Sequence, residues 1–142
     1  MRFTRWYFTD KISFFYIRTQ AKISGLTGFF MFKLKSMLFG VCVKGRIKCY
    51  GPVHIMRAPG SEIVLGKNVC IVSSSLRCTA GSIYAPTKLR THSGTAKILI
   101  GDNIGLNGTS IVARSKTIRI GAGTMIAPNV TIMDSDFHAL WP

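Results

Sequence analysis

The fold is decided by residues 100–112, IGDNIGLNGTSIV, and by their continuation at residues 117–130, TIRIGAGTMIAPNV. Aliphatic residues recur there every six positions, at Ile100, Leu106, Val112 and Ile118, and then in a new phase at Ile120, Ile126 and Ile132. A period of six is neither the 3.6 of a helix nor the 2 of a lone strand, so it indicates a stacked repeat. Three hexads predict a coil of about 18 residues, whose leading aliphatic side chains point inward and whose corners carry small residues.

The same repeat can be followed upstream. Val53 lies one hexad after Ile47, Leu65 lies three hexads after Ile47, and Ile71 lies one hexad after Leu65. Residues 73–96 lack the pattern and are rich in Gly, Pro, Ser and Thr, which predicts an external loop. About four coils are therefore expected between residues 41 and 137.

These hexads resemble the left-handed β-helix of the hexapeptide-repeat acyltransferases, over residues 41–142. Within that family, residues 100–107 and 126–138 resemble the galactoside, maltose and capsule-sugar O-acetyltransferases. The resemblance implies an all-β fold, a left-handed parallel β-helix of about four coils. The left hand comes from the family alone, because ordinary parallel crossovers are right-handed.

The resemblance also implies a function and a partner. The family suggests an acetyl-CoA-dependent O-acetyltransferase that modifies a sugar hydroxyl in capsule, lipopolysaccharide or exopolysaccharide biosynthesis, and that works as a homotrimer with active sites between subunits. In this interpretation acetyl-CoA is a co-substrate and no metal is required. Nucleic acid is not an expected partner, because no nucleic-acid-binding motif accompanies the positive charge.

The ending Asp134-Ser135-Asp136-Phe137-His138 is the most specific part of the resemblance. It implies that His138 is the catalytic base, because a neutral imidazole can take a proton from a sugar hydroxyl near neutral pH. Asn107, one coil earlier, matches an active-site asparagine that contacts the acceptor, or else it simply occupies a coil corner. Asp134 and Asp136 are predicted to orient the imidazole or to bind acceptor hydroxyls, although the galactoside type has no paired acids there.

Members of the family continue for several coils beyond this motif, and those coils hold the pantetheine arm of the cofactor. Since the sequence stops at Pro142, we expect a C-terminally truncated enzyme whose cofactor-binding residues lie in missing coils. The main alternative is an inactive β-helix scaffold or binding module. A metal-dependent hydratase of the related carbonic anhydrase type would need three converging histidines, and His54, His92 and His138 lack the necessary close pair.

The N-terminal segment, residues 1–40, differs from the repeats in composition. The first 50 residues hold ten Lys or Arg against a single acid, Asp10, together with many aromatic residues. Apolar spacings of three and four predict one or two amphipathic helices divided by Gly25 and Gly28. Such helices would either cap the open end of the coils or lie on an anionic membrane surface, as a peripheral inner-membrane contact.

Composition limits the cellular context. Hydrophobic residues make up 47% of the 142 residues, yet no apolar run nears the roughly 18–20 residues of a membrane span, and no signal peptide is evident. A cytoplasmic location, at the inner face of the membrane if the N-terminal segment binds there, is the expectation. Cys42, Cys49, Cys70 and Cys78 lack Cys-x-x-Cys spacing and are expected to be free thiols.

Overall fold

The computed structural model describes the backbone of residues 3–136 and the side chains of residues 7–136. Within that range one long helix, α1 (Phe3–Leu38), precedes a series of short strands. The strands are β1 (Cys42–Val43), β2 (Ile47–Tyr50), β3 (Val53–Met56), β4 (Glu62–Leu65), β5 (Val69–Val72), β6 (Thr87–Thr91), β7 (Lys97–Ile100), β8 (Gly105–Asn107), β9 (Ser110–Ala113), β10 (Thr117–Ile120), β11 (Met125–Ile126) and β12 (Thr131–Met133).

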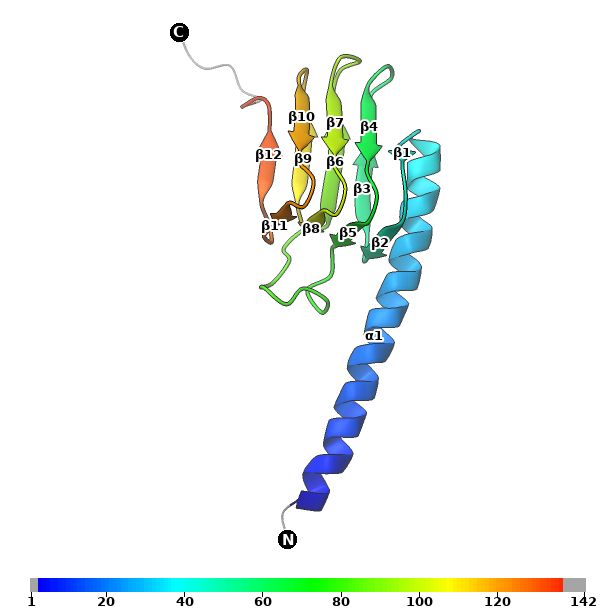
Figure 1. Cartoon of the computed structure of the whole chain (residues 1–142), viewed down its shortest axis with the longest axis vertical. Helices are drawn as coiled ribbons and strands as arrows, with labels where there is room; N and C mark the ends of the chain where they lie inside the picture. Colours follow the sequence, from blue (N-terminus) through cyan, green and yellow to red (C-terminus); the bar gives the residue numbers. More distant parts are fainter. Residues whose placement is uncertain (1–2, 137–142) are drawn as a thin grey trace.

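The strands form three parallel sheets of four strands each, in the orders β1-β4-β7-β10, β11-β8-β5-β2 and β12-β9-β6-β3. Consecutive strands belong to different sheets, so the chain visits the three sheets in turn and completes four coils (Figure 1). This arrangement fits a parallel β-helix and confirms the prediction of a strand-rich, coiled domain.

The coils are longer than the three hexads that the repeat predicted. Ile47 pairs with Val69 and Ile100 pairs with Ile120, so in both cases the next coil begins later than three hexads would place it. Leu65 therefore lies between Val43 and Ile100 and not over Ile47. The added residues are in the corners, where the backbone adopts left-handed conformations at Asn68, Asn103 and Asn129 and at several glycines.

The core is a column of aliphatic side chains inside the coils. It includes the predicted residues Ile47, Val53, Leu65, Ile71, Ile100, Leu106, Ile118 and Ile126. Val112 is buried, as expected, but it lies outside the core cluster that contains its neighbours Ile111 and Ala113. The cause is the corner before β9, which shifts the phase by one residue, and in a strand such a shift reverses the side chain's direction.

The irregular segment is shorter than the predicted loop of residues 73–96. It ends at Pro86, because residues 87–91 form β6, which pairs with β3 on one side and β9 on the other. Thr87, Leu89 and Thr91 fill the inward positions of β6. The sequence hid this strand because two of its three inward residues are threonines, which do not give a hydrophobic repeat.

Gly25 and Gly28 do not divide the N-terminal segment, which is one continuous helix. A β-carbon at Gly28 would lie only 2.7 Å from the carbonyl oxygen of Cys49 and from the backbone nitrogen of Gly51. The glycine is therefore needed for close approach of α1 to the first coil. Phe32, 3% exposed, joins the core cluster from the helix, so this part of α1 covers the open end of the coils (Figure 1).

The first half of α1 extends away from the coils (Figure 1). Taken over the whole of α1, the apolar side chains are spread around the helix and are not gathered on one face, so the expected amphipathic pattern is absent. Large apolar side chains are exposed along it, including Phe8 at 69% and Phe15 at 73%. No helix in residues 3–136 combines the length and hydropathy required to cross a membrane.

Candidate functional site

The two stretches that carry the resemblance lie directly on one another. Gly105 and Leu106 of β8 pair with Met125 and Ile126 of β11, and β9 pairs with β12 in the same direction. The structure thus brings the segment around Asn107 into contact with the segment that leads to Asp134 and Asp136. His138 lies outside the described residues.

Asn107 is half-buried at the corner between β8 and β9. Its Nδ2 donates a 2.8 Å hydrogen bond to the carbonyl oxygen of Ile126, and its backbone carbonyl accepts from the N–H of Asn129 at 3.1 Å. Its own backbone N–H donates to Oγ1 of Thr109 at 3.1 Å. These bonds hold the amide in one orientation. Contact with an acceptor sugar stays a prediction.

The segment between β5 and β6, residues 73–86, reaches the same corner. Asn129 anchors it: its Oδ1 accepts from the N–H of Tyr84 at 2.9 Å and its Nδ2 donates to the carbonyl oxygen of Ser82 at 2.8 Å. At Gly108, where φ is +51°, a β-carbon would lie 2.6 Å from Cγ2 of Ile83. Residues 73–86, which connect two strands of the second coil (β4 to β6), therefore extend over the corners of the third and fourth coils at Gly108 and Asn129, beside Asn107.

Sequence reasoning missed the role of Asn129. The hexad repeat includes this residue but does not reveal its contact with residues 82–84. Asn129 adopts a left-handed φ of +62°, which asparagine tolerates better than most residues, and Gly108 one coil earlier has a φ of +51°.

Asp134 lies at a second corner, where the chain passes from β9 to β10. Its Oδ1 accepts from the backbone N–H of Arg114 at 2.6 Å, and its Oδ2 accepts from the N–H groups of Ser115 and Lys116 at 2.9 and 2.6 Å. Partial burial alone would raise the pKa of the carboxyl, but the three backbone hydrogen bonds outweigh burial and lower the pKa below its ordinary value. The carboxylate thus stabilises the turn at residues 114–116. A direct role in acceptor binding stays a prediction, as it does for Asp136, which is exposed.

His92 lies at the same corner, although no motif in the sequence pointed to it. Its backbone N–H donates to the backbone carbonyl oxygen of Ala113 at 3.0 Å, next to Arg114. Desolvation lowers the pKa of its imidazole first, and the charges of Arg90, Lys88 and Arg114 lower it further, against the opposing effect of Asp134. His92 is therefore a neutral imidazole near pH 7. The register of the coils explains the position of His92. Thr91 pairs with Ala113, so the next residues in the two coils, His92 and Arg114, are neighbours.

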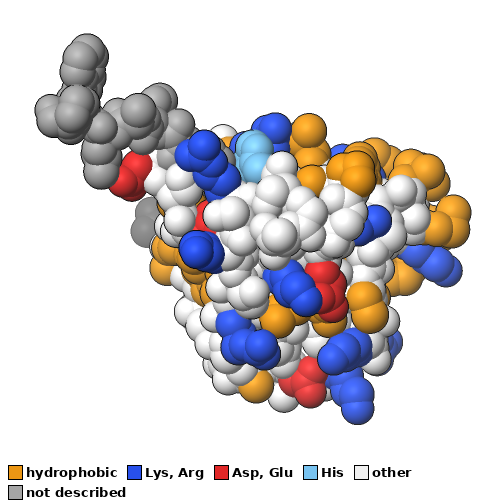
Figure 2. Space-filling model, turned by 90° about the horizontal axis from the view of Figure 1, so that it is seen from above, with side chains coloured by type: hydrophobic (Ala, Val, Ile, Leu, Met, Phe, Trp, Pro, Cys, Tyr) orange, Lys and Arg blue, Asp and Glu red, His pale blue; other side chains and the backbone are white. Residues whose placement is uncertain are grey.

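Figure 2 looks down on this edge of the coils. Lys and Arg side chains are scattered over it and are more prominent than Asp and Glu.

The other reactive side chains give no second centre in the described part of the chain. Among residues 3–136 no group of three His, Cys, Asp or Glu side chains is placed as metal ligands would be. All four cysteines are free thiols. Burial, followed by the neighbouring Cys70, raises the pKa of Cys49 to about 12, so this thiol stays protonated and is a poor nucleophile.

Comparison with known proteins returned no match to a family model, to a curated protein or to a solved structure.

Proposed function

We propose that this protein is an acetyl-CoA-dependent O-acetyltransferase that acts on a sugar hydroxyl in capsule, lipopolysaccharide or exopolysaccharide biosynthesis. In this proposal the coils are left-handed, the enzyme is a homotrimer, and it works in the cytoplasm at the inner face of the membrane. The observation that supports it best is the stacking of the two motif stretches, in which the Asn107 amide binds the backbone of Ile126 at 2.8 Å.

The proposed reaction needs one base and a place for two substrates. Neutral His138 takes the proton of the sugar hydroxyl as the oxygen attacks the acetyl carbonyl of the thioester. The tetrahedral intermediate then collapses, the carbon–sulfur bond breaks, and the imidazolium returns the proton to the leaving thiolate. Asn107 contacts the acceptor, and Asp136 orients the imidazole or binds an acceptor hydroxyl.

Turnover tests this proposal directly. The chain, extended at its C-terminus by the further coils that members of the family carry, is incubated with acetyl-CoA and a panel of sugars, free thiol is measured, and the products are analysed by mass spectrometry. We expect thiol release that requires an acceptor and yields an acetylated sugar. Thiol release that is the same without any acceptor would contradict acetyl transfer to a sugar, and so would no release with any member of a broad panel.

A scaffold or binding module is the second candidate, and Asp134 favours it. Both oxygens of this carboxylate are used by backbone N–H groups of the neighbouring coil, which is a structural task and not a chemical one. If the scaffold hypothesis holds, the chain should bind an oligosaccharide without turnover, and His138→Ala should leave the binding affinity unchanged.

A further inference from the structure

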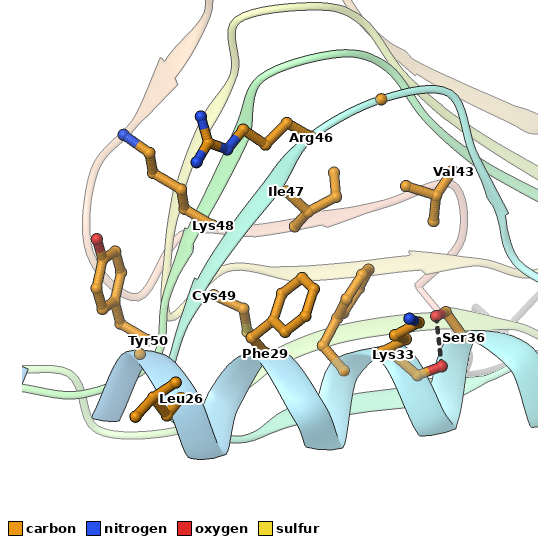
Figure 3. A pocket seen from close by; sticks show the side chains of 13 residues that line it. Leu26, Phe29, Lys33, Ser36, Val43, Arg46, Ile47, Lys48, Cys49 and Tyr50 are labelled. Atoms are coloured by element: carbon orange, nitrogen blue, oxygen red, sulfur yellow. Dashed lines mark hydrogen bonds between the residues drawn. The ribbon is translucent and has the colours of Figure 1, made fainter. Parts of the chain in front are cut away.

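A groove separates the second half of α1 from the first coil (Figure 3). It has a volume of about 600 Å³, within the range of small-molecule sites. One wall is the helix, with Leu26 and Phe29, and the other is the strand β2 with the turn before it. Phe32 and Ile47, both buried, belong to the core cluster at its base. The interior of the groove is therefore apolar.

Several apolar side chains on the walls of the groove are partly exposed. Leu26 is 61% exposed, Phe29 40% and Val43 36%. Leu26 and Phe29 come from α1 and Val43 comes from β1, and all three line the same cavity. The close approach of α1 at Gly28 fixes the separation of the walls, so the groove cannot close by simple collapse of the helix onto the strand.

The edge of the groove is cationic. Arg46, in the turn before β2, and Lys48 of β2 lie together at one end of the groove and extend along the outer side of the coil, whereas Lys33 of the helix lies beside Ser36, away from them (Figure 3). Among the described residues, no acid lines the groove. In the part of the chain whose side chains are described, the ion pair observed joins Lys97 to Glu62 at 3.2 Å, on another sheet. The three cations thus lie beside an apolar cavity without a carboxylate partner.

An apolar groove bordered by cations has the chemistry of a site for an anionic amphiphile. Arginine and lysine are the residues that bind phosphate, and arginine does so through a planar, bidentate fork. A phosphate monoester carries about −1.5 to −2 charge near neutral pH, which matches several cations better than a single carboxylate does. We propose that this groove binds a single-chain lipid phosphate, with its alkyl chain between α1 and β2 and its phosphate beside Arg46 and Lys48.

This proposal does not depend on acetyl transfer, because the groove is at the opposite end of the coils from β12 (Figure 1). The ligand is held within the groove. Adsorption of α1 on a lipid bilayer is a different event, since it uses exposed side chains in the first half of the helix.

Calorimetric titration of the full chain with dodecyl phosphate, below the concentration at which this probe forms micelles, tests the proposal. We expect saturable binding with one ligand per chain. The variant Arg46→Gln/Lys48→Gln should raise Kd at least tenfold. A matched variant, Lys116→Gln/Arg119→Gln, removes the same charge away from the groove and should change Kd less than twofold.

Two further arms separate the chain from the head group. Dodecanol and inorganic phosphate should each bind at least tenfold more weakly than dodecyl phosphate. Phe29→Glu places a like charge in the exposed part of the groove without disturbing the buried core, and it should abolish binding while circular dichroism stays unchanged.

Three results would overturn the proposal. Equal loss of affinity in the two double variants would show attraction to net charge only. Inorganic phosphate binding as tightly as dodecyl phosphate would show an anion site that does not use the apolar groove. Binding only to vesicles that contain the lipid phosphate, with none to the monomeric probe, would assign the interaction to the bilayer surface.

Discussion

The coils and α1 both contain many large apolar residues but use them in opposite ways. In the coils, Leu65, Ile71 and Leu106 are fully buried, whereas in α1 Phe8, Phe15 and Met37 are each more than two-thirds exposed. The difference is periodicity. Residues that recur with the period of a coil form one inward column, while the apolar residues of α1 point to all sides of the helix.

This contrast indicates that the two regions have different tasks. The coils bury most of their apolar side chains in the core and carry polar side chains such as Asn107 and His92 at their corners. Among the described side chains of α1, Phe32 is the large apolar one that is buried, and the others remain at least partly in contact with solvent. Chemistry is therefore expected at the corners of the coils, and association with an apolar or amphipathic partner is expected along α1.

The largest expected effect tests the chemical task of the coils. In the chain extended by the further coils of a family member, His138→Ala should lower kcat by roughly 10²–10⁴-fold, the usual share of general base catalysis. The activity of the unmodified enzyme should fall below an apparent pKa of about 6–7, where the imidazole becomes protonated. His54→Ala, on the outer side of β3, is the control. A His138→Ala enzyme that keeps more than about a third of the activity would exclude this residue as the base.

The next effect tests how closely the two regions touch. Gly28→Ala and Gly25→Ala gain the same helix propensity, about 1 kcal/mol. At Gly28 the new methyl group would meet backbone atoms at 2.7 Å, whereas at Gly25 it would meet the side chain of Tyr50 at 3.2 Å, which can rotate. We expect Gly28→Ala to lower the free energy of unfolding by about 1–3 kcal/mol, the usual cost of overpacking.

Urea denaturation of both variants measures this difference. Gly25→Ala should be neutral or stabilising. If Gly28→Ala is as stable as Gly25→Ala, the helix is not held as close to the first coil as the structure places it, and the cap would be a looser contact.

The sequence predicted the coils better than the helix, and particular residues show why. Hexads beginning at Ile100, Ile120 and Ile126 reveal inward positions, because glycine or small residues follow the aliphatic residue at regular intervals. Coil length and the phase of Val112 could not be obtained in this way, since they depend on left-handed corner residues such as Asn103 and Asn129. Strand β6 was missed because Thr87 and Thr91 fill buried positions.

The candidate site could be predicted only in part for a similar reason. Asn107 and Asp134 were named from the motif, but their hydrogen bonds join residues of successive coils, and only the register of the coils makes these contacts visible. Residues 73–86 approach the Asn107 corner through a hydrogen bond between Ser82 and Asn129. These two residues are far apart in the sequence, so no local pattern predicts their contact.

A smaller effect tests whether Asp134 has the structural role that its contacts indicate. Asp134→Asn should lower the free energy of unfolding at pH 7 by about 1 kcal/mol, because charge-assisted hydrogen bonds are lost at a corner partly open to water. The folded-state pKa of the carboxyl lies below its ordinary value of 3.8. Its contribution is therefore present above that pH and is lost as pH falls through the folded-state pKa.

The difference between Asp134→Asn and the unmodified protein should accordingly shrink when urea denaturation is repeated near pH 3. Asp136→Asn, two residues along and exposed, serves as the matched control and should change stability by less than about 0.5 kcal/mol at either pH. Equal effects of the two substitutions at pH 7 would mean that the three backbone contacts add nothing measurable.

The smallest expected effect concerns the exposed first half of α1, which we expect to associate with anionic lipid vesicles. Arg18 is exposed and lies 5.0 Å from the ring of Phe14, so that charge and apolar surface are adjacent on the helix. A basic residue near an anionic bilayer contributes about 1 kcal/mol. Arg18→Gln should therefore weaken vesicle binding about fivefold in a sedimentation assay, and Arg119→Gln, a charge-matched change on β10, should not. Near 1 M salt the Debye length falls to about 3 Å, and binding of the unmodified protein should weaken strongly. If the chain stays in the supernatant at low salt, α1 does not bind lipid surfaces, and another partner must cover its apolar residues.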